Sequence, residues 1–122
     1  MEIMIVVAII GLLAAVAIPN FIRARSTSQQ RACVNNLRVI DAAKQQWALE
    51  TGQMVTATPG ANDIRPYLGR GIGGNTTSLV CPVASVKTFA SSYTIGDMGT
   101  LPVCLILSGG DADGNYMHML KY

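Results

Sequence analysis

The feature that most constrains this chain is an apolar run of sixteen residues, Ile3–Ile18, with no charge and no side-chain hydrogen-bonding group. A membrane-spanning helix needs about 18–20 such residues. A signal peptide would begin with basic residues and end at a small-residue cleavage site, whereas here Glu2 precedes the run and Pro19 follows it. A core helix this apolar would need a larger domain than the rest of the chain supplies. The Ile, Leu and Val residues favour insertion by more than one terminal acid opposes it, so we predict a membrane segment.

Outside this run the chain is an ordinary small polar domain. Its 122 residues fit one domain, and its net charge of +2 with 6% aromatic residues does not indicate nucleic-acid binding. The arginines that follow the run are interpreted as a solvated face or as lipid headgroup contacts; they are Arg23, Arg25, Arg31 and Arg38. No Ser–His–acid cluster, paired carboxylates or phosphate-binding loop is visible, so the chain is not expected to be an enzyme.

The apolar run continues into an amphipathic segment without Gly or Pro between Pro19 and Gly52. Apolar residues recur there at helical steps of four, three, three and four, at Cys33, Leu37, Ile40, Ala43 and Trp47. The pattern predicts one helix from about residue 2 to about residue 50, capped by Gly52. Pro19 lacks the N–H that would bond the carbonyl of Ala15, so a kink or a loosened turn is expected there, and Gly11 weakens the helix further upstream.

The remainder predicts a small α+β head. Residues 53–80 are a loop region with a short helical turn at Asn62–Leu68, and strands are expected at Ser91–Gly96, Leu101–Leu107 and Tyr116–Tyr122. The predicted fold class is therefore α+β, with a long N-terminal helix packed on a three-stranded antiparallel sheet. We divide the chain into residues 1–22, the apolar half of the helix, and residues 23–122, the head with the amphipathic half.

Three cysteines are present, and none forms a CxxC motif or a cluster with the single histidine, His118, so no zinc site is expected. Two cysteines in a small, loop-rich half indicate one disulfide and an oxidising compartment. We predict that Cys81 pairs with Cys104, because the bridge would pin the loop to a strand. Cys33 would stay reduced, as a small apolar residue on the helix face.

Two further positions allow two interpretations each. Glu2 is either an inert residue at the lipid–water interface or a carboxylate that is buried when apolar helices pack together; in the second case only the register that pairs it with a cation is tolerated. Asp111, Asp113 and Asn115 have the spacing of the start of a calcium loop, but Asp-Gly and Gly-Gly also form simple hairpin turns. A turn is preferred, and calcium is the one cofactor left open.

The segment EIMIVVAIIGLLAAVAIPNFIRAR resembles the N-terminal segment of type IV pilins and type II secretion pseudopilins, and CVNNLRVIDAAKQQWALETG resembles the second half of their helix. In that family a basic leader ending in Gly precedes Phe-Thr-Leu-(Ile/Val)-Glu. This sequence lacks the leader and those first residues, and Met1 stands where Ile or Val is usual; we interpret this as a late start or a trimmed chain. The resemblance implies that Glu2 pairs with the N-terminal amine of a neighbouring subunit. It also implies that Gly11 and Pro19 bracket a stretch that loses helicity on assembly.

The resemblance implies a subunit of a pilus or pseudopilus filament, held in the bacterial inner membrane with its head in the periplasm before assembly. The implied partners are other copies of the chain, a platform protein and a prepilin peptidase, and N-terminal methylation is an associated modification. Pilus and pseudopilus are not separated by these residues. The arginines after the apolar run would by themselves place the head in the cytoplasm, but the cysteines and the resemblance favour the opposite orientation. The alternative from another class is a monomeric, membrane-anchored binding module, such as an adhesin or a DNA-uptake receptor.

Overall fold

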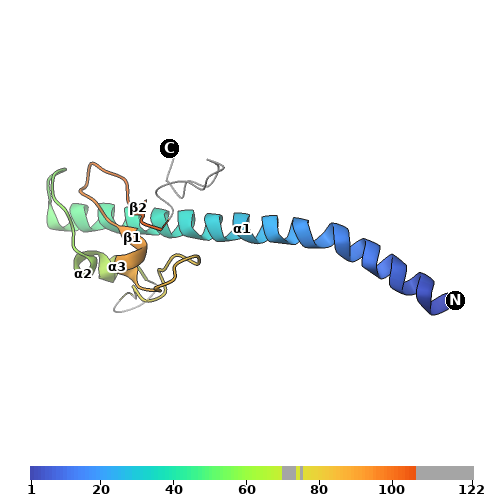
Figure 1. The fold of residues 1–122 in the computed structure, drawn as a ribbon. Helices are drawn as coiled ribbons and strands as arrows, with labels where there is room; N and C mark the ends of the chain where they lie inside the picture. Colours follow the sequence, from blue (N-terminus) through green and yellow to red (C-terminus); the bar gives the residue numbers. More distant parts are fainter. Residues whose placement is uncertain (70–73, 75, 107–122) are drawn as a thin grey trace.

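A computed structural model describes residues 1–69, 74 and 76–106. One long helix, α1, runs the length of the molecule, and a small head packs around its C-terminal half while the N-terminal half projects away (Figure 1). The predicted layout of an apolar helix extending from an α+β head is confirmed to this extent.

Helix α1 spans Glu2–Thr51 and continues through Pro19. Figure 1 shows it bending within its blue N-terminal third, and the proline that removes one helical hydrogen bond is the expected cause. The helix ends at Gly52, whose φ of 65° is left-handed and whose N–H donates to the carbonyl of Ala48. This cap needs glycine, because other side chains rarely adopt that φ. The predicted helix and its cap are both confirmed.

The two halves of α1 differ in what surrounds them. Every residue from 1 to 25 is exposed, and the first buried position is Cys33. The buried face then follows the predicted spacing through Leu37, Ile40 and Ala43, with Trp47 half-buried against the same core. Lys44 joins this face with only 1% of its surface exposed, which the apolar pattern did not predict.

The predicted turn after the helix is present as two short elements. Helix α2 spans Ala61–Ile64, and a 3₁₀ turn, η1, follows at Arg65–Tyr67. The Asp63 carboxylate accepts a hydrogen bond of 2.8 Å from the N–H of Gly60, which closes the start of α2. Ile64 is fully buried and carries this segment into the core beneath α1.

The prediction of a strand beginning at Ser91 is wrong, because Ser91 and Ser92 end a short helix, α3, at Phe89–Ser92. Thr88 caps this helix: its hydroxyl oxygen accepts a hydrogen bond of 3.3 Å from the N–H of Ser91. The Ser92 hydroxyl donates to the carbonyl of Thr88 at 2.8 Å. Serine and threonine side chains that bond nearby backbone favour such turns over extended chain, which explains the difference.

The described sheet has two strands, β1 at Tyr93–Thr94 and β2 at Val103–Cys104. They are antiparallel, with Tyr93 opposite Cys104 and Thr94 opposite Val103. The strand predicted at Leu101–Leu107 is therefore shorter than expected within its described part. The third predicted strand, Tyr116–Tyr122, lies outside the described residues.

The core forms where α1 meets the head. Helix α1 contacts α2, η1 and β2. Their buried apolar side chains form one cluster: Cys33, Leu37, Ile40, Ala43, Ile64, Leu68, Leu79, Cys81, Ala84, Phe89, Tyr93 and Cys104. All three cysteines belong to it, so the fold gathers sulfur atoms that lie far apart in the sequence.

Candidate functional site

The projecting half of α1 is the most exposed apolar surface of the described chain. The helix contains an 18-residue window with a mean hydropathy of 2.6, none of it buried, which is long and apolar enough to cross a membrane. Its large side chains lie open all round, with Ile3 79%, Leu12 73% and Phe21 70% exposed. An apolar surface of this extent marks a membrane or protein contact.

Glu2 lies in the first turn of α1, at the tip of this apolar segment. The position is favourable for an acid, since the N-terminus of a helix carries a partial positive charge. Glu2 is exposed in the single chain. The structure therefore places a carboxylate at the end of the apolar segment, where it would be covered once such segments pack side by side.

Gly11 and Pro19 both lie inside α1 and both are exposed. Apart from the nearby backbone of α1 itself, a Cβ added at Gly11 would meet no atom of the described residues within 4 Å, so packing among these residues does not require glycine there. A reason for glycine must then come from a neighbouring molecule or from the conformational freedom of the backbone.

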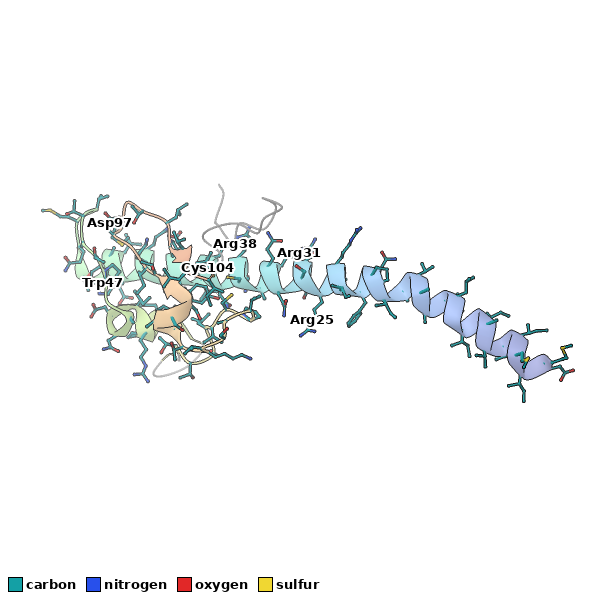
Figure 2. All side chains as sticks on the ribbon, viewed as in Figure 1. Arg25, Arg31, Arg38, Trp47, Asp97 and Cys104 are labelled. Carbon is teal, nitrogen blue, oxygen red and sulfur yellow. The ribbon has the colours of Figure 1, made fainter. Side chains whose placement is uncertain are left out.

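The three cysteines meet in the core, where α1 packs against the head. Cys33 comes from α1, Cys81 from the loop that precedes α3, and Cys104 from β2, where Figure 2 labels it beside the helix. All three have 0% of their surface exposed. Their sulfur atoms lie within 4.8 Å of one another. The predicted partners Cys81 and Cys104 are thus brought together. Cys33 lies on the buried helix face, as predicted, and its sulfur joins the other two.

Hydrogen bonds surround this sulfur cluster. The Asn36 amide donates to the hydroxyl of Tyr93 at 3.0 Å and to the carbonyl of Val80 at 3.3 Å. Hydrogen bonding with Cys104 and burial raise the pKa of the Cys33 thiol, while hydrogen bonding from Tyr93 acts in the opposite direction. Burial also raises the pKa of Cys81, against a hydrogen bond from the backbone of Val83. The surroundings thus keep the thiols protonated unless oxidation or a cation removes the protons.

A second polar group lies further along the same helix face. The ammonium of Lys44 donates to the main-chain carbonyls of Ile95 at 3.4 Å, Asp97 at 2.9 Å and Thr100 at 2.5 Å. The Asp41 carboxylate lies 3.8 Å from the same nitrogen. Burial lowers the pKa of Lys44, and the nearby carboxylates of Asp41 and Asp97 partly oppose this. Every N–H of the ammonium can be satisfied in this arrangement, so Lys44 holds the loop between the two strands.

Asp97 contributes its side chain to the same loop. Hydrogen bonding from Thr100 lowers the pKa of its carboxyl, against a partial desolvation. One of its carboxylate oxygens, Oδ1, is buried and has no hydrogen-bond partner among residues 1–69, 74 and 76–106. The loop around Lys44 is therefore ordered by charged groups as well as by its backbone.

Several sequence-predicted site residues cannot be compared with the structure. Asp111, Asp113, Asn115 and His118 all lie outside the described residues. Conversely, sequence reasoning missed the burial of Lys44 and the closeness of the Cys33 sulfur to those of Cys81 and Cys104. Lys44 does have a signal, because it follows Ile40 by four residues and precedes Trp47 by three, which puts it on the buried face.

One curated relative is informative. The chain is 49% identical over 49 residues to "Type IV major pilin protein PilA" of Myxococcus xanthus. The match covers 40% of this chain and 22% of that protein, so the chain spans well under two thirds of its relative's length. No protein-family model matches the chain. No solved structure matches it either. The resemblance to type IV pilins stated from the sequence is confirmed by this relative and by the long apolar helix.

Proposed function

We propose that this chain is a structural subunit of a type IV pilus-like filament, anchored in a membrane by the first part of α1 before assembly. The observation that carries the proposal is that residues 1–25 are all exposed although most of them are apolar. Leaving so much apolar surface in water is unfavourable by about 25 cal/mol per Å², so lipid or other protein must cover it. The similarity to a type IV major pilin favours lipid as the cover before assembly and neighbouring subunits as the cover afterwards.

The division of the chain follows from this role. Residues 1–22 would lie in the bilayer first and in the filament interior afterwards, and residues 23–122 would form the outer surface. Such a subunit works by packing and not by catalysis. A platform protein and a prepilin peptidase would be its assembly partners, with the head in the periplasm before extraction. A pseudopilus of a secretion system is the closest variant of the same proposal.

Glu2 is the residue we assign to axial register. Inside a bundle of apolar helices its carboxylate would be surrounded by hydrocarbon, where an unpaired charge is strongly disfavoured. Subunits would therefore pack in the register that brings a cation of the neighbouring chain to Glu2. Apolar side chains alone do not specify such a register, because they are interchangeable along the helix.

The test is assembly of the Glu2→Ala and Glu2→Gln variants in cells that carry the filament machinery. Both variants are expected to insert into the membrane normally and to form few or no filaments, since they lose the charge and keep the apolar surface. Membrane fractionation measures the first property, and electron microscopy of sheared filaments measures the second.

Glu2→Asp is the matched control, because it keeps the charge and shortens the side chain by one methylene; it is expected to assemble better than either neutral variant. Normal filaments from Glu2→Gln would contradict the role of Glu2. A wild-type chain that stays monomeric in the membrane beside a working assembly machinery would contradict the filament proposal itself.

A membrane-anchored binding module is the second candidate, and one observation favours it. A shallow groove runs along α1 between Thr27 and Arg38, and it is lined by Arg31 and Asn35 as well. Figure 2 shows the labelled Arg31 and Arg38 on one side of this part of the helix, and Arg25 on the other side. Arginine side chains suit anionic groups. Binding of an anionic ligand by a chain that forms no filament would favour this candidate.

A further inference from the structure

The sulfur cluster of Cys33, Cys81 and Cys104 brings three sulfur atoms together, whereas a disulfide requires only two. A disulfide uses two sulfurs about 2.05 Å apart and leaves a third cysteine anywhere in the fold. Here three sulfurs from three separate segments converge, all with 0% of their surface exposed and all within 4.8 Å of one another. Bringing a helix, a loop and a strand to one point places three soft donor atoms around one centre.

The size of the cluster matches a metal ion. Zinc binds thiolate sulfur at about 2.3 Å in tetrahedral geometry, which separates neighbouring sulfurs by about 3.8 Å. Sulfurs that lie within 4.8 Å of one another would need only small side-chain rotations to reach that separation. Three cysteines also suit the soft d¹⁰ ions in general, because thiolates are their preferred ligands.

Groups around the cluster are placed to support thiolate ligands. Hydrogen bonding with Cys104 and burial raise the pKa of the Cys33 thiol, and hydrogen bonding from Tyr93 lowers it. Burial raises the pKa of the Cys81 thiol, and hydrogen bonding from the backbone of Val83 lowers it. The Asn36 amide donates to the Tyr93 oxygen at 3.0 Å, which leaves the hydroxyl proton of Tyr93 available for the sulfur. Donors of this kind orient metal ligands and spread their negative charge.

We propose that Cys33, Cys81 and Cys104 form a three-thiolate site for a soft d¹⁰ metal ion such as Zn²⁺. Binding replaces three S–H protons, which leave to solvent, by three metal–sulfur bonds, and no oxidation or reduction takes place. One coordination position stays open for water or another small donor. The bound ion would tie α1 to both the loop and β2. The site uses the sulfurs of the disulfide expected from the sequence, so a metal-bound chain and a Cys81–Cys104 disulfide exclude each other.

The test uses the full chain in detergent, purified without oxygen with a phosphine reductant, because a thiol reductant would itself bind Cd²⁺ and give the same absorption band. Elemental analysis after Zn²⁺ loading is expected to give one ion per chain. Titration with Cd²⁺ is expected to produce the ultraviolet charge-transfer band of cadmium–thiolate bonds, saturating at one equivalent. Cys33→Ser should weaken Cd²⁺ binding by at least about tenfold, and Tyr93→Phe should weaken it by about 10- to 100-fold.

The matched control is the double variant Cys33→Ser/Gln46→Cys. Gln46 is exposed on α1, so this chain keeps three thiols and loses their convergence. It is expected to bind Cd²⁺ as weakly as Cys33→Ser does, and circular dichroism would establish that the helix content of each variant is unchanged. The proposal would be overturned if the double variant bound Cd²⁺ as tightly as the wild-type chain does. A reduced wild-type chain that binds no ion, or a disulfide in anaerobically prepared protein, would overturn it as well.

Discussion

The side-chain nitrogen of Lys44 lies 2.9 Å from the main-chain carbonyl oxygen of Asp97, fifty-three residues further along the chain. The same nitrogen also donates to the carbonyls of Ile95 and Thr100. A lysine with 1% of its surface exposed is unusual unless its charge is fully paired, and here backbone carbonyls and the Asp41 carboxylate provide the pairing. This cation is a main link between α1 and the loop that joins the two strands.

Replacing Lys44 by Met should therefore destabilise the head strongly. Methionine fills a similar volume but leaves the carbonyls of Ile95, Asp97 and Thr100 without their donor, at an expected loss of about 3 kcal/mol. Urea denaturation of the chain in detergent measures this loss. The control is Lys87→Met, which removes the same charge from an exposed position and should change stability by less than about 0.5 kcal/mol. Similar stabilities for the two variants would contradict the role given to Lys44.

The lowered pKa of the Asp97 carboxyl predicts that the stability of the folded chain depends on pH in the acid range. Its pKa is lowered in the folded chain, first by hydrogen bonding from Thr100, so the folded state holds the proton less tightly than the unfolded state. The resulting stabilisation is present above the ordinary value of 3.8 and is lost as the pH falls through the lower folded value. Asp97→Asn should be less stable than wild type at pH 7, and the difference should shrink towards pH 3. A difference that stays constant between these pH values would contradict this assignment.

In an assembled filament, the stretch from Gly11 to Pro19 is predicted to lose regular helical hydrogen bonds. Proline removes one bond and glycine lowers helix propensity, and the residues of this stretch are all exposed in the described structure. The single chain is continuously helical here, so a detergent-solubilised monomer should remain helical with a bend. Cryo-electron microscopy of filaments and hydrogen exchange of the monomer would measure the two states. A filament map with an unbroken helix through residues 11–19 would contradict the prediction.

For the metal-free chain in an oxidising compartment, we predict a disulfide between Cys81 and Cys104, with Cys33 left as a thiol. Closing a loop of about 24 residues should stabilise the head by about 3 kcal/mol. The structure places the sulfur of Cys33 within 4.8 Å of the other two, so Cys33 competes with each of them for a disulfide partner. Peptide mapping without reduction, after chelation and oxidation, identifies the linked pair. A linked Cys33 peptide would contradict the predicted pairing.

Most of what the sequence predicted correctly depends on local interactions. Helix α1 and its end at Gly52 follow from apolar spacing, helix propensity and a left-handed cap, all of which act within a few residues. The exposed apolar half follows from the uninterrupted apolar run Ile3–Ile18. The error at Ser91 is also local, because hydrogen bonds that Thr88 accepts from the two serines outweigh an alternating pattern that is only six residues long.

The sequence by itself determined the long helix, its apolar half with the acid at the tip, and the face on which the head packs, because these depend on residues three or four apart. Only the tertiary structure decided that Cys33 joins Cys81 and Cys104 and that Lys44 is buried under the loop at Asp97. Those contacts connect positions about fifty or more residues apart, and their geometry depends on how the loop and strands fold back on α1. Spacing along a chain carries no record of such distances, so the candidate metal site could not be inferred from the sequence.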